Sequence, residues 1–334
     1  MFKLLFFSFL IFGSLIAISS YSWFGMWIGL EINLLSIIPL LKSPQSLYPS
    51  ESAMKYFITQ SLASMVFLFS ILMLNNLNEF IFSNLNFFLN LALNSALLLK
   101  VGMAPFHSWF PEVMEGLNWS MAFTLLTWQK LSPMVILMYS LNTINFLVFI
   151  IISSAMVSGI LGLNQISLRK ILAYSSINHM AWMLASILYM KMIWFWYFCI
   201  YFLILVNIIV MLEIFQIFYL KQLFNSMNQN KLMKLFFILN FFNLGGLPPF
   251  LGFLPKWLIS NNLIENNFFF VNFILIIFTL IPLFFYMRMT FSTLTFFQNE
   301  FIFSIPTTLK FWIILLNSFT LAGLLVCTSI LSIF

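Results

Sequence analysis

The chain has 334 residues, of which 63% are apolar and only 7% are charged, with a net charge of +6. About a quarter of the residues in soluble domains are charged, and disordered chains are more polar still, so the composition excludes both classes. A membrane-spanning helix needs roughly 20 apolar residues, so ten or eleven spans would use about two thirds of the chain. The sequence therefore predicts an all-α polytopic membrane protein.

The positive charges are scattered between apolar runs, which favours orientation in a membrane over binding of nucleic acid. The two cysteines, Cys199 and Cys327, lie in separate apolar runs and belong to no CxxC pair. A zinc site, an iron–sulfur cluster or a disulfide framework needs more thiols than these. We therefore expect no zinc site, no iron–sulfur cluster and no disulfide framework in this chain.

Apolar runs separated by polar residues predict one transmembrane domain over residues 1–334 with about eleven spans. The first run also has the basic start and apolar stretch of a cleaved signal peptide, but the second run follows at once, which favours a retained helix. The predicted spans are 3–20, 22–42, 53–75, 81–112, 119–140, 143–162, 170–189, 193–219, 233–262, 267–289 and 309–331.

Two of these spans are too long for a simple crossing and contain helix breakers. The fourth carries Gly102 and Pro105, and the ninth carries Gly246 followed by Pro248 and Pro249. Proline removes a backbone donor and glycine loosens the backbone, so both segments are predicted to be discontinuous helices.

The two broken spans are five apart, and so are the second and seventh spans, which carry Glu31 and His179. An odd separation reverses the direction of the chain across the membrane, which is typical of an inverted repeat. The predicted inverted five-helix halves are roughly 1–140 and 143–289, and 309–331 is an extra C-terminal helix.

The loop charges predict the orientation, because basic residues gather on the cytoplasmic or matrix side of a membrane. Lys191 is the one basic residue predicted on the opposite side from the N-terminus. We therefore expect the N-terminus on the matrix or cytoplasmic side and, after eleven crossings, the C-terminus on the other side. The ten basic residues on the N-terminal side are Lys3, Lys42, Lys55, Arg169, Lys170, Lys221, Lys231, Lys234, Arg288 and Lys310.

Five titratable residues lie at similar depth well inside the spans, where a charge costs at least about 2.5 kcal/mol. One such residue could be half of an ion pair that fixes helix packing, but five favour a path for protons. Burial disfavours a charged lysine and a nearby carboxylate favours it, so a lysine can load and release a proton. A metal-cation site would need more acids than the one present. These residues are Glu31, Lys100, Lys130, His179 and Lys256.

Four ordered motifs, within a stretch from about 27 to 257, carry a resemblance to the antiporter-like membrane subunits of respiratory complex I. They are KVGMAPFHSWFPEVMEG at 100–116, LTWQKLSP at 126–133, GLNQ at 162–165 with RKILAYSSINHM at 169–180, and NLGGLPPFLGFLPKW at 243–257.

The resemblance implies a subunit of NADH–ubiquinone oxidoreductase that moves protons across the mitochondrial inner membrane. The NADH, flavin, iron–sulfur and ubiquinone sites would lie on other subunits, and the partners would be neighbouring antiporter-like subunits and lipids such as cardiolipin. Glu31 matches the family's glutamate, Lys100 its partner, Lys130 the middle lysine and Lys256 the terminal group, with His179 on the connecting axis.

Three other functions are compatible with parts of this pattern. A stand-alone cation/proton antiporter shares the predicted architecture and is the main alternative. A haem carrier would need His107 and His179 as its two ligands, and a structural anchor would tolerate loss of the charges within the spans.

Overall fold

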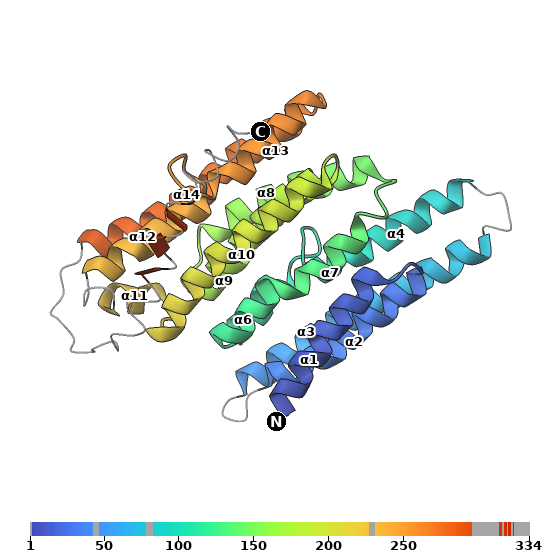
Figure 1. Ribbon diagram of the computed structural model, residues 1–334, viewed down its shortest axis with the longest axis horizontal. Coiled ribbons are helices and arrows are strands. Elements are labelled where there is room, and N and C mark those ends of the chain that lie inside the picture. Colours follow the sequence, from blue (N-terminus) through green and yellow to red (C-terminus); the bar gives the residue numbers. More distant parts are fainter. Residues whose placement is uncertain are drawn as a thin grey trace. The chain divides into compact units, whose positions relative to one another are not determined.

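The computed structural model describes residues 2–42, 47–77, 83–226 and 231–295, with seven single positions between 314 and 323. The described chain is helical, and its one bridge between extended residues joins Ser167 to Tyr219 (Figure 1). Six described helices are long and apolar enough to cross a membrane, which agrees with a polytopic helical protein. They are Phe2–Ser19, Trp23–Leu41, Tyr48–Asn76, Ile144–Gly162, Lys191–Ile214 and Phe269–Phe291.

Seven helices match predicted continuous spans, with ends that differ by a few residues. The last predicted span, 309–331, falls almost entirely outside the described residues, so the total of eleven spans and the inverted repeat stay predictions. The seven helices are α1 (Phe2–Ser19), α2 (Trp23–Leu41), α3 (Tyr48–Leu77), α8 (Ile144–Gly162), α9 (Leu168–Ile187), α10 (Lys191–Ile214) and α14 (Phe269–Thr295).

Both predicted helix breaks are confirmed. The first separates α4 (Ser83–Val101) from α5 (Trp109–Glu115), and the second separates α12 (Lys231–Gly245) from α13 (Phe253–Glu265). Each break begins at a glycine in the left-handed region, Gly102 with φ of 80° and Gly246 with φ of 76°. Side chains other than glycine rarely adopt this conformation, so the two glycines end α4 and α12.

The predicted span 119–140 is wrong as a single helix, because the chain forms α6 (Trp119–Leu126) and α7 (Trp128–Leu137). The interruption lies at Thr127, whose φ and ψ are −117° and −73°. The Thr127 hydroxyl donates a hydrogen bond to the Phe123 carbonyl at 2.7 Å, which gives that carbonyl a side-chain partner at the helix end. Pro133 lies inside α7 and does not end it.

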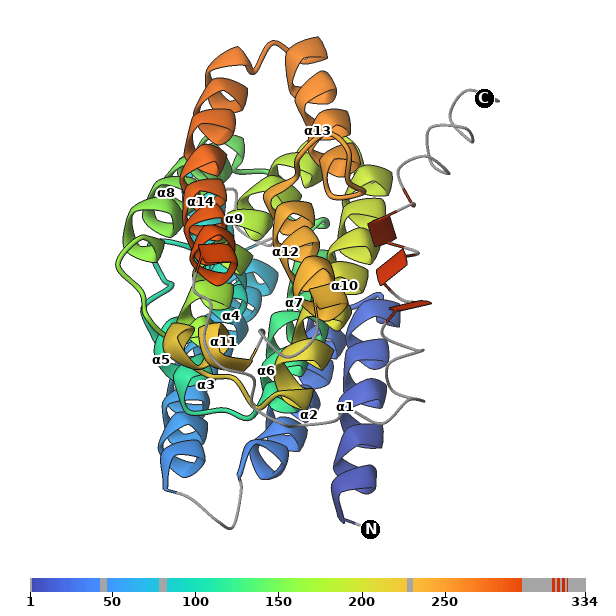
Figure 2. The same ribbon diagram turned by 90° about the vertical axis from the view of Figure 1, so that its left-hand side faces the viewer.

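The chain forms two compact units, Met1–Ser154 and Ala155–Phe334, whose boundary falls within α8. In the first unit α1 packs on α2, α3 packs on α2, α4 and α5, and α7 contacts α1, α2, α4 and α6. In the second unit α10 packs on α9, α12 and α13, and the short α11 (Leu220–Ser226) contacts α14. Figure 2 shows α13 turning back into α14. The predicted halves 1–140 and 143–289 stay a prediction.

Small residues hold α1 and α2 close together. A Cβ added at Gly29 would lie 2.5 Å from the Ala17 backbone nitrogen, and one added at Gly13 would lie 2.9 Å from the Asn33 nitrogen. Such close backbone approach is typical of small residues between membrane helices. The contact fixes α2, which carries Glu31 and Asn33.

Candidate functional site

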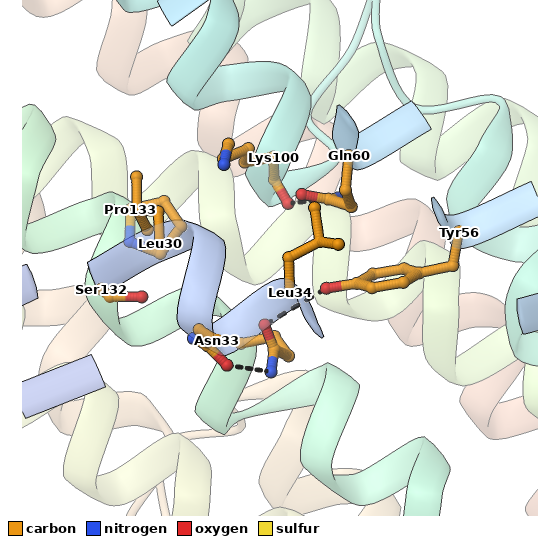
Figure 3. A pocket seen from close by; sticks show the side chains of 9 residues that line it. Leu30, Asn33, Leu34, Tyr56, Gln60, Lys100, Ser132 and Pro133 are labelled. Atoms are coloured by element: carbon orange, nitrogen blue, oxygen red, sulfur yellow. Dashed lines mark hydrogen bonds between the residues drawn. The ribbon is translucent and has the colours of Figure 1, made fainter. Parts of the chain in front are cut away.

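Lys100 lies in the last turn of α4, two residues before the glycine that begins the first break. Its backbone carbonyl accepts a hydrogen bond from the Gln60 amide of α3 at 3.2 Å. The side chain, 7% exposed, lines a small polar pocket with room for about one water molecule. The other lining residues come from α2, α3 and α7 (Figure 3): Leu30, Asn33, Leu34, Tyr56, Gln60, Gln129, Ser132 and Pro133.

A chain of hydrogen bonds crosses this pocket and joins three helices. The Tyr56 hydroxyl of α3 donates to the Gln129 side-chain oxygen of α7 at 3.2 Å, and the Gln129 amide donates to the Asn33 oxygen of α2 at 2.8 Å (Figure 3). The sequence analysis did not single out these three residues. The available signal was a polar side chain in an apolar run, as with Asn33, or beside a predicted site residue, as with Gln129.

Glu31 lies on α2, half-buried, and interacts electrostatically with the Lys100 ammonium. Within the described ranges, no direct ion pair joins Glu31 to Lys100, and the two interact through space. A carboxylate at this range can bias the charge of the lysine without being locked to it.

Lys130 lies in the first turn of α7, immediately after the interruption at Thr127, and is 2% exposed. Its ammonium lies 4.6 Å from the ring centroid of Phe110 on α5, within the range of a cation–π interaction. The aromatic face offers partial negative charge but cannot take a proton. The contact links Lys130 to the second half of the first broken helix.

Lys256 lies in the first turn of α13 and reaches back across the second break. Its ammonium donates a hydrogen bond to the Gly245 carbonyl, at the end of α12, at 2.8 Å. A Cβ added at Gly246 would lie 2.9 Å from the ammonium nitrogen, so only glycine leaves room for this contact. Asn243 also braces the break, because its side-chain oxygen accepts from the Gly252 amide at 2.7 Å.

His179 lies on α9, a helix in which every residue except Arg169 and Lys170 is buried. Its Nδ1 lies 2.9 Å from the Tyr197 hydroxyl of α10, and the Tyr201 ring lies 4.9 Å from the imidazole between centroids. The first unit thus holds Glu31, Lys100 and Lys130, and the second holds His179 and Lys256. Among the residues that the structure describes, no cluster of three or more His, Cys, Asp or Glu side chains could hold a metal ion.

Residues 20–282 match the family described as NADH:quinone oxidoreductase/Mrp antiporter, TM. The chain belongs to this family. The match covers both broken helices and all five predicted site residues, and it confirms the resemblance that the four motifs carry.

Named relatives in this NADH:quinone oxidoreductase/Mrp antiporter family cover most of the chain. NADH-ubiquinone oxidoreductase chain 2 of Anopheles gambiae is 47% identical over 284 residues, which are 85% of this chain and 83% of the relative. The protein of the same name from Lemur catta is 41% identical over 293 residues, 86% of this chain and 84% of the relative.

Solved structures of the family share the fold. A chain of respiratory complex I from Thermus thermophilus superposes with a TM-score of 0.86 over 96% of this chain and 77% of that one, at 21% identity. A chain of the Mrp complex from a Dietzia species gives a TM-score of 0.73 at 12% identity, over 90% of this chain and 61% of that one. The predicted antiporter-like membrane fold is thereby confirmed.

Proposed function

We propose that this chain is a proton-translocating, antiporter-like core subunit of NADH–ubiquinone oxidoreductase, which couples electron transfer from NADH to ubiquinone to proton pumping. It would lie in the mitochondrial inner membrane with its N-terminus on the matrix side and its C-terminus on the intermembrane-space side. Other complex I subunits, above all neighbouring antiporter-like subunits, would be its partners, with lipids such as cardiolipin around them. Flavin, iron–sulfur and ubiquinone sites would lie on those other subunits.

One observation carries the proposal. Three lysines are buried in the part of the chain that the structure describes, and each of them lies in the first or last turn of a helix beside an interruption: Lys100, Lys130 and Lys256. Helix ends leave backbone groups without helical partners, and such groups hold water or a charge where lipid cannot reach. A lysine at such a place can gain and lose a proton, which a lysine in plain hydrocarbon cannot do at acceptable cost.

The proposed order of transfer begins on the matrix side. Lys100 takes a proton under the influence of Glu31 and passes it to Lys130, and His179 carries it onward to Lys256. Each arriving positive charge would destabilise the charge on the next lysine and favour its release. His179 suits the connecting step because a histidine changes charge near neutral pH.

A stand-alone cation/proton antiporter is the second candidate. The names of the relatives at 40–47% identity support the complex I subunit over this alternative. Purification of the native particle separates the two candidates, because a complex I subunit copurifies with flavin and iron–sulfur proteins. A stand-alone antiporter would instead exchange cations for protons in liposomes by itself.

The test of the proton path is Lys130→Met in the assembled enzyme, since methionine keeps the volume roughly and cannot titrate. We expect lower proton translocation and slower NADH–ubiquinone turnover, with NADH oxidation by an artificial acceptor unchanged. Lys191→Met, which removes an exposed lysine at the start of α10, is the matched control and should pump like the wild type. Normal pumping by a fully assembled Lys130→Met enzyme would show that Lys130 is structural.

The proposed topology has a separate test. Accessibility labelling from one side of the membrane should reach the N-terminus and the segment 220–233, and labelling from the other side should reach the C-terminus. Labelling of both termini from the same side would contradict the layout.

A further inference from the structure

The imidazole of His179 lies against two buried tyrosines of α10. The Tyr197 hydroxyl lies 2.9 Å from Nδ1, which is a hydrogen-bond distance, and both side chains are buried. Tyr201 contacts the same imidazole through its ring, at 4.9 Å between centroids and with 38° between the planes. One tyrosine therefore binds a ring nitrogen, and the other packs on the ring.

A hydrogen bond at Nδ1 fixes how the imidazole handles protons. Neutral histidine has one N–H and one bare nitrogen, so the group bound at Nδ1 decides the role of Nε2. If Nδ1 accepts from the tyrosine, Nε2 carries the hydrogen, and if Nδ1 donates, Nε2 is left to accept. The other residues of the proton path would exchange protons with His179 at Nε2. Whether Nε2 can accept a proton therefore depends on the hydrogen bond between Nδ1 and Tyr197.

A tyrosine hydroxyl suits a histidine that changes its charge inside a membrane. When Nδ1 carries the hydrogen and Nε2 is bare, the tyrosine oxygen accepts from Nδ1, and it can go on accepting after Nε2 takes a proton and both nitrogens are donors. Nδ1 then keeps a partner in both charge states. A carboxylate would instead hold the charged form, and an aliphatic neighbour would leave a buried polar atom without a partner.

We propose that Tyr197 is a positioning residue that orients His179 and keeps its Nδ1 hydrogen-bonded through each proton transfer. This inference rests on the proposed function, because it gives His179 a step in the proton path. Tyr201 holds the imidazole from the side and takes no part in its hydrogen bonding.

The helices around His179 carry few other titratable groups that bear on this step. α9 packs against α10, α13 and α14. Besides Tyr197 and Tyr201, the buried titratable side chains on these helices are Tyr174 on α9, Lys256 on α13 and Tyr286 on α14, and Tyr286 interacts electrostatically with Tyr197 and Tyr201. Lys256 is bound to the Gly245 carbonyl, and Tyr286 packs on the rings of Phe241 and Phe285.

Four variants of the assembled enzyme test the inference: Tyr197→Phe, Tyr201→Phe, His179→Gln, and Tyr197→Phe combined with His179→Gln. Tyr197→Phe keeps the ring and loses only the hydroxyl, so we expect proton-coupled NADH–ubiquinone turnover to fall about 3- to 10-fold. The KM for ubiquinone should not change, and the solvent deuterium isotope effect on turnover should rise because proton transfer becomes slower. Tyr201→Phe, the matched control, should lower turnover less than twofold, about the effect of a weakened ring contact.

The double variant distinguishes action through His179 from a general packing effect. Because Tyr197 acts through the imidazole, Tyr197→Phe should have no further effect once His179 is glutamine. The inference is overturned if Tyr197→Phe resembles Tyr201→Phe, if the isotope effect does not change, or if the loss is equally large in the His179→Gln background.

Lys130→Met shows which proposal has failed. If Lys130→Met blocks pumping while Tyr197→Phe is silent, only the role of Tyr197 is lost. If Lys130→Met pumps normally, the proposed proton path is contradicted, and the proposed role of Tyr197 is contradicted as well.

Discussion

The two broken helices share one backbone device and place their lysines differently. In each, a glycine in the left-handed region ends the first half-helix. At the first break Lys100 precedes the glycine, lines a polar pocket and interacts electrostatically with the carboxylate of Glu31. At the second break Lys256 follows the glycine and binds the Gly245 carbonyl at the end of α12.

The difference lies in the partner of the positive charge. The carbonyl end of a helix carries partial negative charge that does not titrate, so Lys256 has a permanent acceptor. The partner of Lys100 is a carboxylate, a kind of group whose charge is not permanent, so the environment of Lys100 can change. We therefore expect the charge of Lys100 to depend on Glu31, and Lys256 to exchange its proton from a fixed position.

Gly246→Ala should have the largest effect on stability, because it disrupts the contact of Lys256 with the Gly245 carbonyl at the second break. An alanine in the left-handed region costs about 1–2 kcal/mol of stability. Its Cβ would also displace the Lys256 ammonium, and loss of that charged hydrogen bond would cost about 1.5–3 kcal/mol more. Thermal inactivation of the assembled enzyme should begin at a lower temperature, and proton translocation per assembled enzyme should fall.

Gly102→Ala sharpens this comparison at the first break. It carries a similar backbone cost, but its Cβ would meet the Trp109 ring and the Phe110 Cβ, each at 3.2 Å, in place of a lysine. It should destabilise the enzyme less than Gly246→Ala. Equal losses for the two alanines would contradict the special role of Gly246 at Lys256.

Gln129→Leu tests the hydrogen-bonded pocket at the first break, and we expect its effect on stability to be intermediate. The change leaves the Tyr56 hydroxyl and the Asn33 oxygen without their partner, at a cost of about 2 kcal/mol in stability. Adding Tyr56→Phe should return part of the loss, since it removes one of the two unsatisfied groups. A midpoint of thermal inactivation equal to that of the wild type would show that the network does not hold the three helices together.

Of these four variants, Glu31→Gln should have the smallest effect on stability, and its main consequence should be slower turnover. Glutamine keeps the shape and removes the charge that acts on Lys100, so proton-coupled turnover should fall about threefold or more at unchanged assembly. Glu213→Gln changes an exposed acid on α10 and is the matched control. The same loss in both variants would remove the basis for a dependence of Lys100 on Glu31.

Much of this arrangement could be predicted from the sequence, because the deciding signals are local. Glycine and proline mark both breaks, and charged residues in apolar runs point to Lys100, Lys130 and Lys256 whatever their neighbours are. The interruption at Thr127 could not be predicted, since threonine fits a continuous apolar helix and the hydrogen bond to the Phe123 carbonyl is known only from the fold.

The contacts between segments that are distant in the chain also could not be predicted from the sequence. The packing of α2, α3 and α7 brings together Asn33, Tyr56 and Gln129. The proposed role of Tyr197 likewise depends on its short distance to His179, which only the structure shows. The predicted partner of Lys100 was a side chain, and nothing in the sequence indicated that the partner of Lys256 is a backbone carbonyl.

The most direct test of the central claim, that buried lysines transfer protons, is proton translocation by a Lys130→Arg enzyme. Arginine keeps the positive charge and the cation–π contact with Phe110 but does not release a proton in proteins. If Lys130 works by transferring protons, fully assembled Lys130→Arg should pump as poorly as Lys130→Met. If Lys130→Arg pumps like the wild type while Lys130→Met does not, the charge at this position is structural and the account is contradicted.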